Sequence, residues 1–257
     1  MHVIGIIPAR MASSRFPGKP LAKIGDMPMI GHVYYRSKLS KTLSEVYIAT
    51  CDREIMDYAE SIGAKAVMTL ATHERASDRA AEAMITIEKD LAHKVDIVVM
   101  IQGDEPMLHP EMIDEVLKPI IDNPDIHVVN LMSLMNSREE HEDPNEVKVV
   151  TDTQGFALYF SREPIPSRKK WEKDIPMLKQ VCLIPFRRDF LLKFNELPPT
   201  PLEIIESVDM LRVLEHGYDV KMVKTNFSTY SVDTPEDLAF VNQCMRDDSL
   251  IVRYKRN

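Results

Sequence analysis

Apolar residues in the first half of the chain follow two alternating patterns. Short uninterrupted apolar runs predict buried strands, and segments that repeat apolar residues every three to four positions predict amphipathic helices. The strands are predicted at Val3–Ile7, Glu45–Thr50, Ala64–Thr69 and Ile97–Ile101, and the helices at Ile30–Ser37, Ile55–Ile62, His73–Lys89 and Pro110–Leu117. Because strands and helices alternate, we expect parallel βαβ units with right-handed crossovers.

The second half of the chain has a less regular pattern. Apolar runs with short connections predict strands at His127–Met135, Val147–Thr151, Phe156–Ser161, Gln180–Phe186 and Val220–Lys224. An amphipathic helix is predicted over Glu203–His216, ended by Gly217, and a last helix runs from Pro235 through Cys244. The charged stretch Ser167–Pro176 predicts a loop. The fold class expected is therefore α/β, with a mixed, mostly parallel central sheet flanked by helices and a smaller antiparallel portion.

Composition narrows the class of protein. Across 257 residues, 44% are hydrophobic and 28% charged, as in ordinary globular proteins. The net charge of -8 argues against broad nucleic-acid binding, which needs a basic surface. The three cysteines have no paired spacing, so we expect free thiols, with Cys51 buried and structural. No apolar run is long enough to span a bilayer, and none resembles a signal peptide, so we expect a cytoplasmic protein without a membrane partner.

Three cations follow the first predicted strand within ten residues: Arg10, Arg15 and Lys19. A cationic loop after a buried strand is how a parallel α/β sheet presents phosphate ligands at its carboxyl edge. The loop is not a Walker P-loop, because Ser13 and Pro20 stand where that motif needs Gly and Ser or Thr. Its Ser13 and Ser14 hydroxyls and its cations suit a polyphosphate, although a solvated basic loop is the alternative for any run of charges.

Carboxylates follow the strand at Ile97–Ile101, in the segment Gln102-Gly103-Asp104-Glu105-Pro106. Mg²⁺ that accompanies a triphosphate is held by one or two carboxylates and by the phosphates, so Asp104 is a candidate ligand. Asp233 follows another apolar run, but the sequence Asp-Thr-Pro-Glu is also a good helix start. From the residues alone, Asp233 is favoured as the N-cap of this helix.

The chain resembles the CMP-KDO synthetases, the 3-deoxy-manno-octulosonate cytidylyltransferase family. The first signature, Pro8-Ala9-Arg10-x-x-Ser13-Ser14-Arg15-x-Pro17-Gly18-Lys19-Pro20-Leu21, is followed by a second at Ile101–Pro106. Further matches keep the family's order over nearly the whole chain: Met68-Thr69, Asp143–Val150, Ala157–Arg162, Pro201-Leu202-Glu203 and Val232–Asp237.

The resemblance implies transfer of CMP from CTP to a small acidic acceptor, with Mg²⁺, on a nucleotide-diphospho-sugar transferase-like fold. It implies one cytidylyltransferase domain over residues 1–257, with a nucleotide part at about 1–125, an acceptor and dimerisation part at about 126–230 and a C-terminal helix at 231–257. A homodimer is also implied. The implied catalytic residues are Arg10, Lys19 and Asp104, and the implied metal ligands are Asp104 and Asp233. With Asp233 at the metal, Thr234 becomes the better candidate for the N-cap. The implied nucleotide-binding residues are Ala9, Arg10, Ser13, Ser14, Arg15, Lys19, Met68, Thr69, His73, Arg79 and Gln102. The implied acceptor-binding residues are Arg79, Gln102, Tyr159, Ser161, Arg162, Gln180 and Glu203. Glu206, one helical turn after Glu203, is a candidate for acceptor hydroxyls or for ordering the metal site, although a surface charge is the favoured interpretation.

Two segments depart from the family pattern. The family's Ser-Gly-Thr-Glu-Arg is Arg75–Arg79 here, with Ala76 in place of the glycine. The family's His-Leu-Gly-Ile-Tyr-Gly-Tyr, which lines the sugar-acid site, is Gln180–Phe186 here, so its histidine becomes Gln180 and its first tyrosine becomes Ile184. Each hydrogen-bond partner removed from a buried site costs about 1–3 kcal/mol. A different acceptor, such as another sugar acid or a phosphonate-like acid, is therefore the close alternative, although Gln180 can replace the histidine as a donor.

Two alternatives come from other classes of protein. A glycosyltransferase that uses a nucleotide sugar would normally carry an Asp-x-Asp metal motif, which this sequence lacks. A non-catalytic nucleotide-binding protein would not need to keep Lys19, Asp104 and Asp233.

Overall fold

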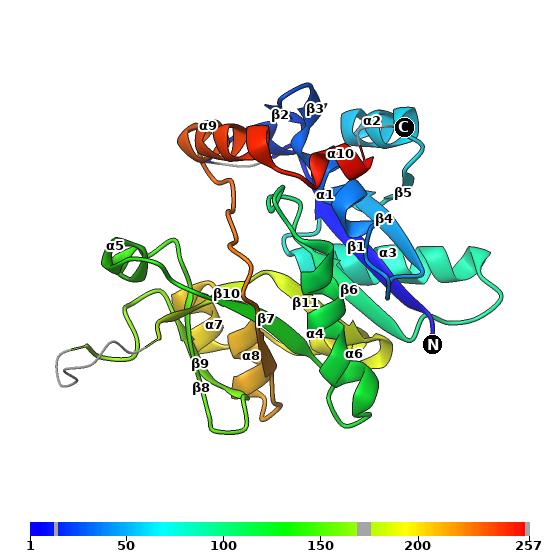
Figure 1. The fold of residues 1–257 in the computed structure, drawn as a ribbon. Helices are drawn as coiled ribbons and strands as arrows, with labels where there is room; N and C mark the ends of the chain where they lie inside the picture. Colours follow the sequence, from blue (N-terminus) through cyan, green and yellow to red (C-terminus); the bar gives the residue numbers. More distant parts are fainter. Residues whose placement is uncertain (13–14, 169–175, 255–257) are drawn as a thin grey trace. The chain divides into compact units, whose positions relative to one another are not determined.

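The computed structural model describes residues 1–12, 15–168 and 176–254, and most of the charged stretch Ser167–Pro176 lies outside them. The chain forms two compact units (Figure 1). The first unit comprises Met1–Asp114 and Thr229–Asn257, and the second comprises Glu115–Ser228. No helix among the described residues is long and apolar enough to cross a membrane.

Four parallel strands form the sheet of the first unit in the spatial order β6-β1-β4-β5. Their bounds are β1 (Val3–Ala9), β4 (Glu45–Thr50), β5 (Lys65–Met68) and β6 (Ile97–Ile101). Every residue of β1 and β6 is buried, as expected for uninterrupted apolar runs in a parallel sheet covered on both faces. The predicted parallel βαβ arrangement is confirmed.

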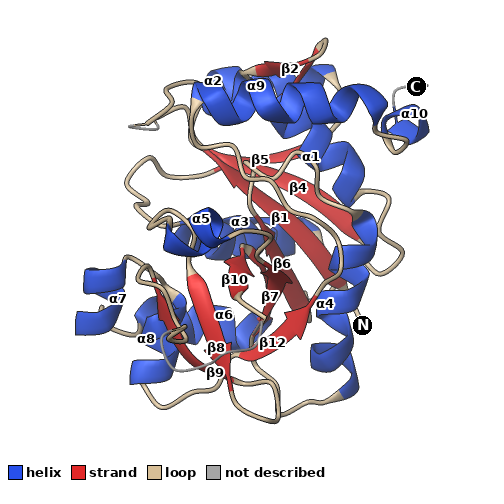
Figure 2. Cartoon of the chain, turned by 60° about the vertical axis from the view of Figure 1, so that its left-hand side comes forward, coloured by secondary structure: helices blue, strands red, loops and turns tan. Residues whose placement is uncertain are grey.

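Helices connect these strands: α1 (Met29–Ser37), α2 (Arg53–Ser61) and α3 (Ala76–Asp90), with α4 (Pro110–Asp122) following β6. The chain moves from β1 to β4 to β5 in one direction and then returns past β1 to β6. Right-handed crossovers therefore put α1 and α2 on one face of the sheet and α3 on the other (Figure 2). The strand order reverses between β1 and β6, and such a switch point is where ligands bind in open α/β sheets.

The C-terminal segment belongs to the first unit. It contains α9 (Pro235–Cys244), a short 3-10 helix (Met245–Asp247) and α10 (Ile251–Tyr254). Val232, Val241 and Met245 are buried together with Met29 of α1. This packing holds the start of α9 against the unit that contains β1 and β6. Short elements after β1 complete the unit: a 3-10 helix (Lys19–Leu21) and the two-stranded hairpin of β2 (Lys23–Ile24) and β3 (Met27–Pro28).

Arg36 of α1 anchors the end of the segment. Its guanidinium is completely buried and forms an ion pair with Asp248, and it donates a hydrogen bond to the hydroxyl of Tyr254.

The second unit contains a mixed sheet in the spatial order β12-β7-β10-β8-β9. Its strands are β7 (Val129–Leu134), β8 (Lys148–Thr151), β9 (Ala157–Ser161), β10 (Leu178–Val181) and β12 (Lys221–Lys224). The pairs β7–β10, β10–β8 and β8–β9 are antiparallel, and β12 runs parallel to β7. The smaller antiparallel portion is thus present. The predicted run Gln180–Phe186 is divided at Cys182 between β10 and β11 (Leu183–Arg187). The helices are α5 (Arg138–Glu142), α6 (Arg188–Glu196), α7 (Pro201–Glu206) and α8 (Met210–Glu215).

The prediction of one helix over Glu203–His216 is wrong. The segment forms α7 and α8, which are separated at Ser207, whose φ of 52° is the left-handed conformation that ends a helix. Apolar residues at helical spacing continue across this break, so the spacing carried no sign of it.

Glu203 has a structural role within the second unit, and the acceptor-binding role that the resemblance implies stays a prediction. Its side chain is 3% exposed, and its two carboxylate oxygens accept hydrogen bonds from Arg212 Nε at 2.8 Å and Nη2 at 2.6 Å. The Thr200 N–H donates to the same carboxylate at 3.2 Å, at the start of α7. Both oxygens are therefore engaged within the second unit, joining α7 to α8.

The cysteines form no disulfide among the described residues, as predicted. Cys51 is half-buried, so the expectation of a buried thiol is corrected.

Replacing Glu203 with Ala should destabilise the protein by about 3–5 kcal/mol, because it leaves the Arg212 charge buried without a partner. The shift is measured as a lower midpoint in urea unfolding followed by circular dichroism. The matched control is Glu196→Ala at an exposed position of α6, which should change stability by less than about 0.5 kcal/mol. An E203A variant with unchanged stability and a raised KM for the acceptor would contradict the structural role and support acceptor binding instead.

Candidate active site

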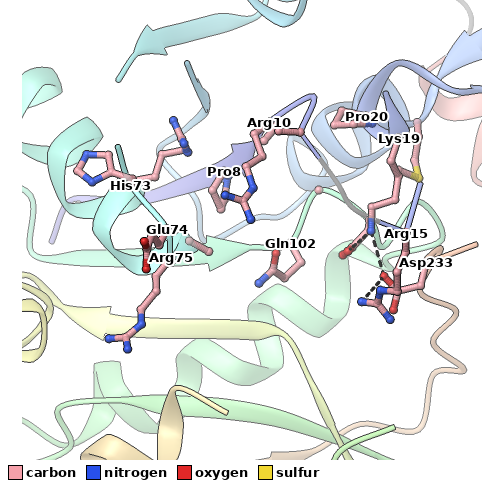
Figure 3. A pocket seen from close by; sticks show the side chains of 17 residues that line it. Pro8, Arg10, Arg15, Lys19, Pro20, His73, Glu74, Arg75, Gln102 and Asp233 are labelled. Atoms are coloured by element: carbon pink, nitrogen blue, oxygen red, sulfur yellow. Dashed lines mark hydrogen bonds and ion pairs between the residues drawn. The ribbon is translucent and has the colours of Figure 1, made fainter. Parts of the chain in front are cut away.

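A cavity of about 320 Å³ opens at the carboxyl edge of the parallel sheet in the first unit. Five segments line it: the end of β1 with the loop after it, the first residue of α1, the residues around the start of α3, the loop after β6, and Asp233, two residues before α9 (Figure 3). These include the two loops at the switch point between β1 and β6. The cavity thus lies where the topology predicts a ligand.

One end of the cavity is formed by Lys19 and two aspartates. Lys19 Nζ lies 2.8 Å from Asp104 Oδ2 and 3.1 Å from Asp233 Oδ1. Arg15 Nη2 lies 3.1 Å from the same Asp233 oxygen (Figure 3). Burial alone would lower the pKa of Lys19, but the Asp104 and Asp233 carboxylates together raise it above its ordinary value. Lys19 is therefore a fixed positive charge between two carboxylates that are far apart in the sequence.

Backbone hydrogen bonds bring the two aspartates together. The Val232 N–H donates to the Asp104 carbonyl at 2.9 Å, which places Asp233 beside the loop after β6. At the start of α9, Thr234 Oγ1 accepts the Asp237 N–H at 3.2 Å, and the Asp237 carboxylate accepts the Asp233 and Thr234 N–H groups. Thr234 is thus the N-cap, and the N-cap alternative for Asp233 is wrong. The Asp233 carboxylate faces Lys19 and Arg15 instead.

The donor chemistry at this end fits Mg²⁺. Two carboxylates converge on one ammonium group, so the point between them already favours a cation. The part of the chain that the structure describes has no cluster of three His, Cys, Asp or Glu side chains able to hold a metal. Mg²⁺ characteristically takes one or two carboxylates and completes its shell with phosphate and water oxygens. Asp104 and Asp233 therefore match a metal that binds together with a polyphosphate.

The middle of the cavity carries the residues that follow the two central strands. Ala9 is the last residue of β1, Arg10 follows it directly, and Gln102 comes directly after β6. Figure 3 shows Arg10 and Gln102 between the end with Lys19 and the end with His73. Arg10 is exposed and forms no ion pair with any described residue. Its charge is therefore available to an anionic ligand. The predicted Ser13 and Ser14 lie outside the described residues.

The other end of the cavity is organised by α3. Glu82 bonds to His73 Nε2 and accepts the Leu70 N–H at 2.9 Å. Partial burial opposes ionisation of Glu82, but the hydrogen bonds from Leu70 and His73 hold its pKa below the ordinary value. Arg79, 3% exposed, donates to the Thr69 hydroxyl and to the Leu70 carbonyl. Two side chains of α3 thus fix the segment between β5 and α3.

The predicted nucleotide residues differ in how they reach the cavity. His73 and Arg79 line it. Thr69 is not among the lining residues and contacts Arg79, and Met68 is 43% exposed at the end of β5, also away from the cavity. Glu82 was missed by the sequence prediction. Its position, three residues after Arg79 on the same helix, was the available signal.

Three of the predicted acceptor residues meet within the second unit. Tyr159 and Ser161 donate their hydroxyls to Glu206 Oε1 at 3.2 and 3.1 Å, and the Arg162 N–H donates to Oε2 at 2.7 Å. Glu206 is therefore the centre of a hydrogen-bond network, and the expectation that it is a surface charge is wrong. Gln180 donates from Nε2 to Asn130 Oδ1 at 2.5 Å, within the same sheet.

The comparisons with known proteins agree with this geometry. The model of a family described as cytidylyltransferase matches residues 4–224. The chain is 45% identical over 248 residues to the 3-deoxy-manno-octulosonate cytidylyltransferase of Geobacter metallireducens, covering 93% of this chain and 95% of that protein. It is 43% identical to the protein of the same name from Solibacter usitatus, covering 95% and 94%.

Solved structures give the same result. The structure of a CMP:2-keto-3-deoxy-manno-octonic acid synthetase complexed with CTP is similar, with a TM-score of 0.88, 37% identity, and coverage of 96% of this chain and 99% of that one. A cytidylyltransferase from Leptospira borgpetersenii shares the fold, with a TM-score of 0.64 and 18% identity over 96% of this chain and 87% of that one. With matches of this extent, the chain belongs to the cytidylyltransferase family, among the 3-deoxy-manno-octulosonate cytidylyltransferases.

Proposed function

We propose that this protein transfers CMP from CTP to 3-deoxy-manno-octulosonate (KDO) and releases pyrophosphate. The observation that carries the proposal is the placement of Lys19 between Asp104 and Asp233 in the cavity at the carboxyl edge. Cations and carboxylates that alternate in one cavity suit a triphosphate with its metal. The high similarity to relatives named 3-deoxy-manno-octulosonate cytidylyltransferase supports KDO as the acceptor.

The residues of the chain act by positioning charge, since a nucleotidyl transfer needs no covalent enzyme intermediate. Arg10 and Lys19 neutralise phosphate oxygens and hold the α-phosphorus where an acceptor oxygen can attack in line with the departing pyrophosphate. The Asp104 and Asp233 carboxylates raise the pKa of Lys19, so Lys19 carries its positive charge before the nucleotide binds. At the opposite end of the cavity, His73 and Arg79 lie where the nucleoside is expected to bind.

We propose Mg²⁺ as the cofactor, held by Asp104 and Asp233. When bound, it supplies positive charge that offsets the charge of the triphosphate and of the leaving pyrophosphate. Lys19 would then share the carboxylates with the metal and turn towards the phosphates. A homodimer, which the resemblance implies, and a cytoplasmic location, which the cysteine content and apolar pattern favour, stay predictions.

A second acceptor has a specific observation in its favour. Ile184 is 3% exposed and Phe186 is completely buried, and the Gln180 amide is already engaged by Asn130. The segment that aligns with the family's sugar-acid site thus offers few polar groups. A cytidylyltransferase that acts on another acidic acceptor is the alternative.

Release of pyrophosphate from CTP in the presence of KDO tests the proposed function directly. We expect turnover with KDO that exceeds turnover with other sugar acids or with a phosphonate acid. Asp104→Asn should lower kcat on the order of 100-fold or more, because it removes a charge that organises the transition state. Asp247→Asn, at an exposed position, is the control and should keep full activity. Turnover only with a different acid would select the alternative acceptor.

Removal of divalent cations tests the metal. Excess EDTA should abolish pyrophosphate release, and added Mg²⁺ should restore it. Asp233→Asn should raise the Mg²⁺ concentration needed for half-maximal rate, because one of two carboxylate ligands is lost. Full turnover in EDTA would contradict the metal assignment.

A further inference from the structure

Asp52 stands at the N-cap position of α2, yet its side chain makes no hydrogen bond to that helix. An Asp at an N-cap ordinarily accepts an N–H from the first turn, which stabilises the helix by about 0.5–2 kcal/mol. Here Asp52 Oδ2 accepts the Met11 N–H instead, at 2.7 Å. The carboxylate therefore serves a segment far away in the sequence rather than its own helix.

Met11 connects the two ends of the cationic loop. It follows Arg10 directly, and its carbonyl accepts the Gly18 N–H at 3.0 Å. Gly18 has a φ of 74°, which only glycine adopts readily, and the next residue is Lys19. One carboxylate thus fixes the Arg10–Met11 peptide directly. Through one further hydrogen bond, from the Gly18 N–H to the Met11 carbonyl, it also fixes the Pro17–Gly18 peptide, one residue before Lys19.

Asp52 is itself held by the sheet. Its N–H donates to Thr50 Oγ1 at 3.1 Å, and Thr50 is completely buried at the end of β4. Thr50 is the parallel partner of Ala9 at the end of β1. Asp52 therefore links the buried end of β4 to the loop that follows the neighbouring strand β1.

We propose that Asp52 is a positioning residue for nucleotidyl transfer, whose carboxylate holds the Met11 peptide and thereby sets Arg10 and Lys19 at the spacing that the triphosphate requires. The proposal rests on the proposed function, since it takes CTP as the ligand of the cavity. Small displacements of positioning groups are enough to reduce rates strongly.

Three variants of Asp52 separate positioning from helix stability. Asp52→Asn keeps a side-chain oxygen that can accept the Met11 N–H. Asp52→Ala removes the acceptor. Asp52→Ser removes it as well, because the hydroxyl is one bond shorter, but serine is a good N-cap and can stabilise α2 directly. Asp57→Ser, at an exposed position of the same helix, is the matched control.

Binding of CTP in the presence of Mg²⁺ is measured by titration calorimetry, and the melting temperature of each variant by differential scanning calorimetry. We expect D52A and D52S to weaken CTP binding by about tenfold or more, as for the loss of a hydrogen bond to a charged group. D52N should stay within about threefold of wild type, and the control should match wild type. D52S should keep the wild-type melting temperature. If Asp52 only stabilised the fold, a variant with wild-type stability would also keep wild-type affinity for CTP.

Two results would overturn the proposal: wild-type CTP affinity in D52S, or a loss in D52N as large as in D52A. An error in the proposed acceptor can be distinguished from an error in the proposed role of Asp52, because the titration uses CTP and no acceptor. A wild-type protein that binds CTP but does not turn over KDO would refute the acceptor and leave the test of Asp52 intact.

Discussion

Two carboxylates with like charge, Asp104 and Asp233, must be held side by side, and Lys19 makes this possible. Two unit charges 4 Å apart interact by about 4 kcal/mol at the effective dielectric constant near a protein surface. One lysine within 3.1 Å of both carboxylates supplies two attractions against the single repulsion between them. Binding of a metal would use the same carboxylates, so Lys19 keeps the pair assembled before the ligand arrives.

Much of the first unit can be understood as support for this charge cluster. The buried strands β1 and β6 end beside each other at the switch point. The loop after β1 carries Lys19, and the loop after β6 carries Asp104. Asp233 comes from the far end of the chain, so the C-terminal segment has to be tied in. The buried contacts of Val232 and Val241 and the bond from Val232 to the Asp104 carbonyl provide that tie. Hydrophobic burial thus helps to hold Asp233 beside Asp104, whose like charge would repel it if Lys19 were absent.

The sequence was most informative where a residue type is required by chemistry. The cations after β1 and Asp104 after β6 were predicted from the residues, because strand ends follow local rules. Local rules alone favoured Asp233 as the N-cap, and only the family resemblance favoured Thr234. The break at Ser207 was not predicted, since apolar spacing continues through it and a left-handed serine leaves no compositional sign. The places of Glu203 and Glu206 also escaped prediction. Both lie on α7, and only the tertiary contacts decide that one pairs with Arg212 and the other collects donors from β9 and the residue after it.

The same reasoning explains why the nucleotide could be assigned more firmly than the acceptor. Phosphate and metal are recognised by full charges, which remain visible in a sequence as Arg10, Lys19, Asp104 and Asp233. A sugar acid is recognised largely by hydroxyl and amide hydrogen bonds, and such groups can also satisfy one another. Tyr159 and Ser161 donate to Glu206 and Gln180 donates to Asn130, all inside the second unit. Selectivity for the acceptor therefore depends on which of these internal hydrogen bonds an incoming hydroxyl can replace, a difference of about 1 kcal/mol for each exchange.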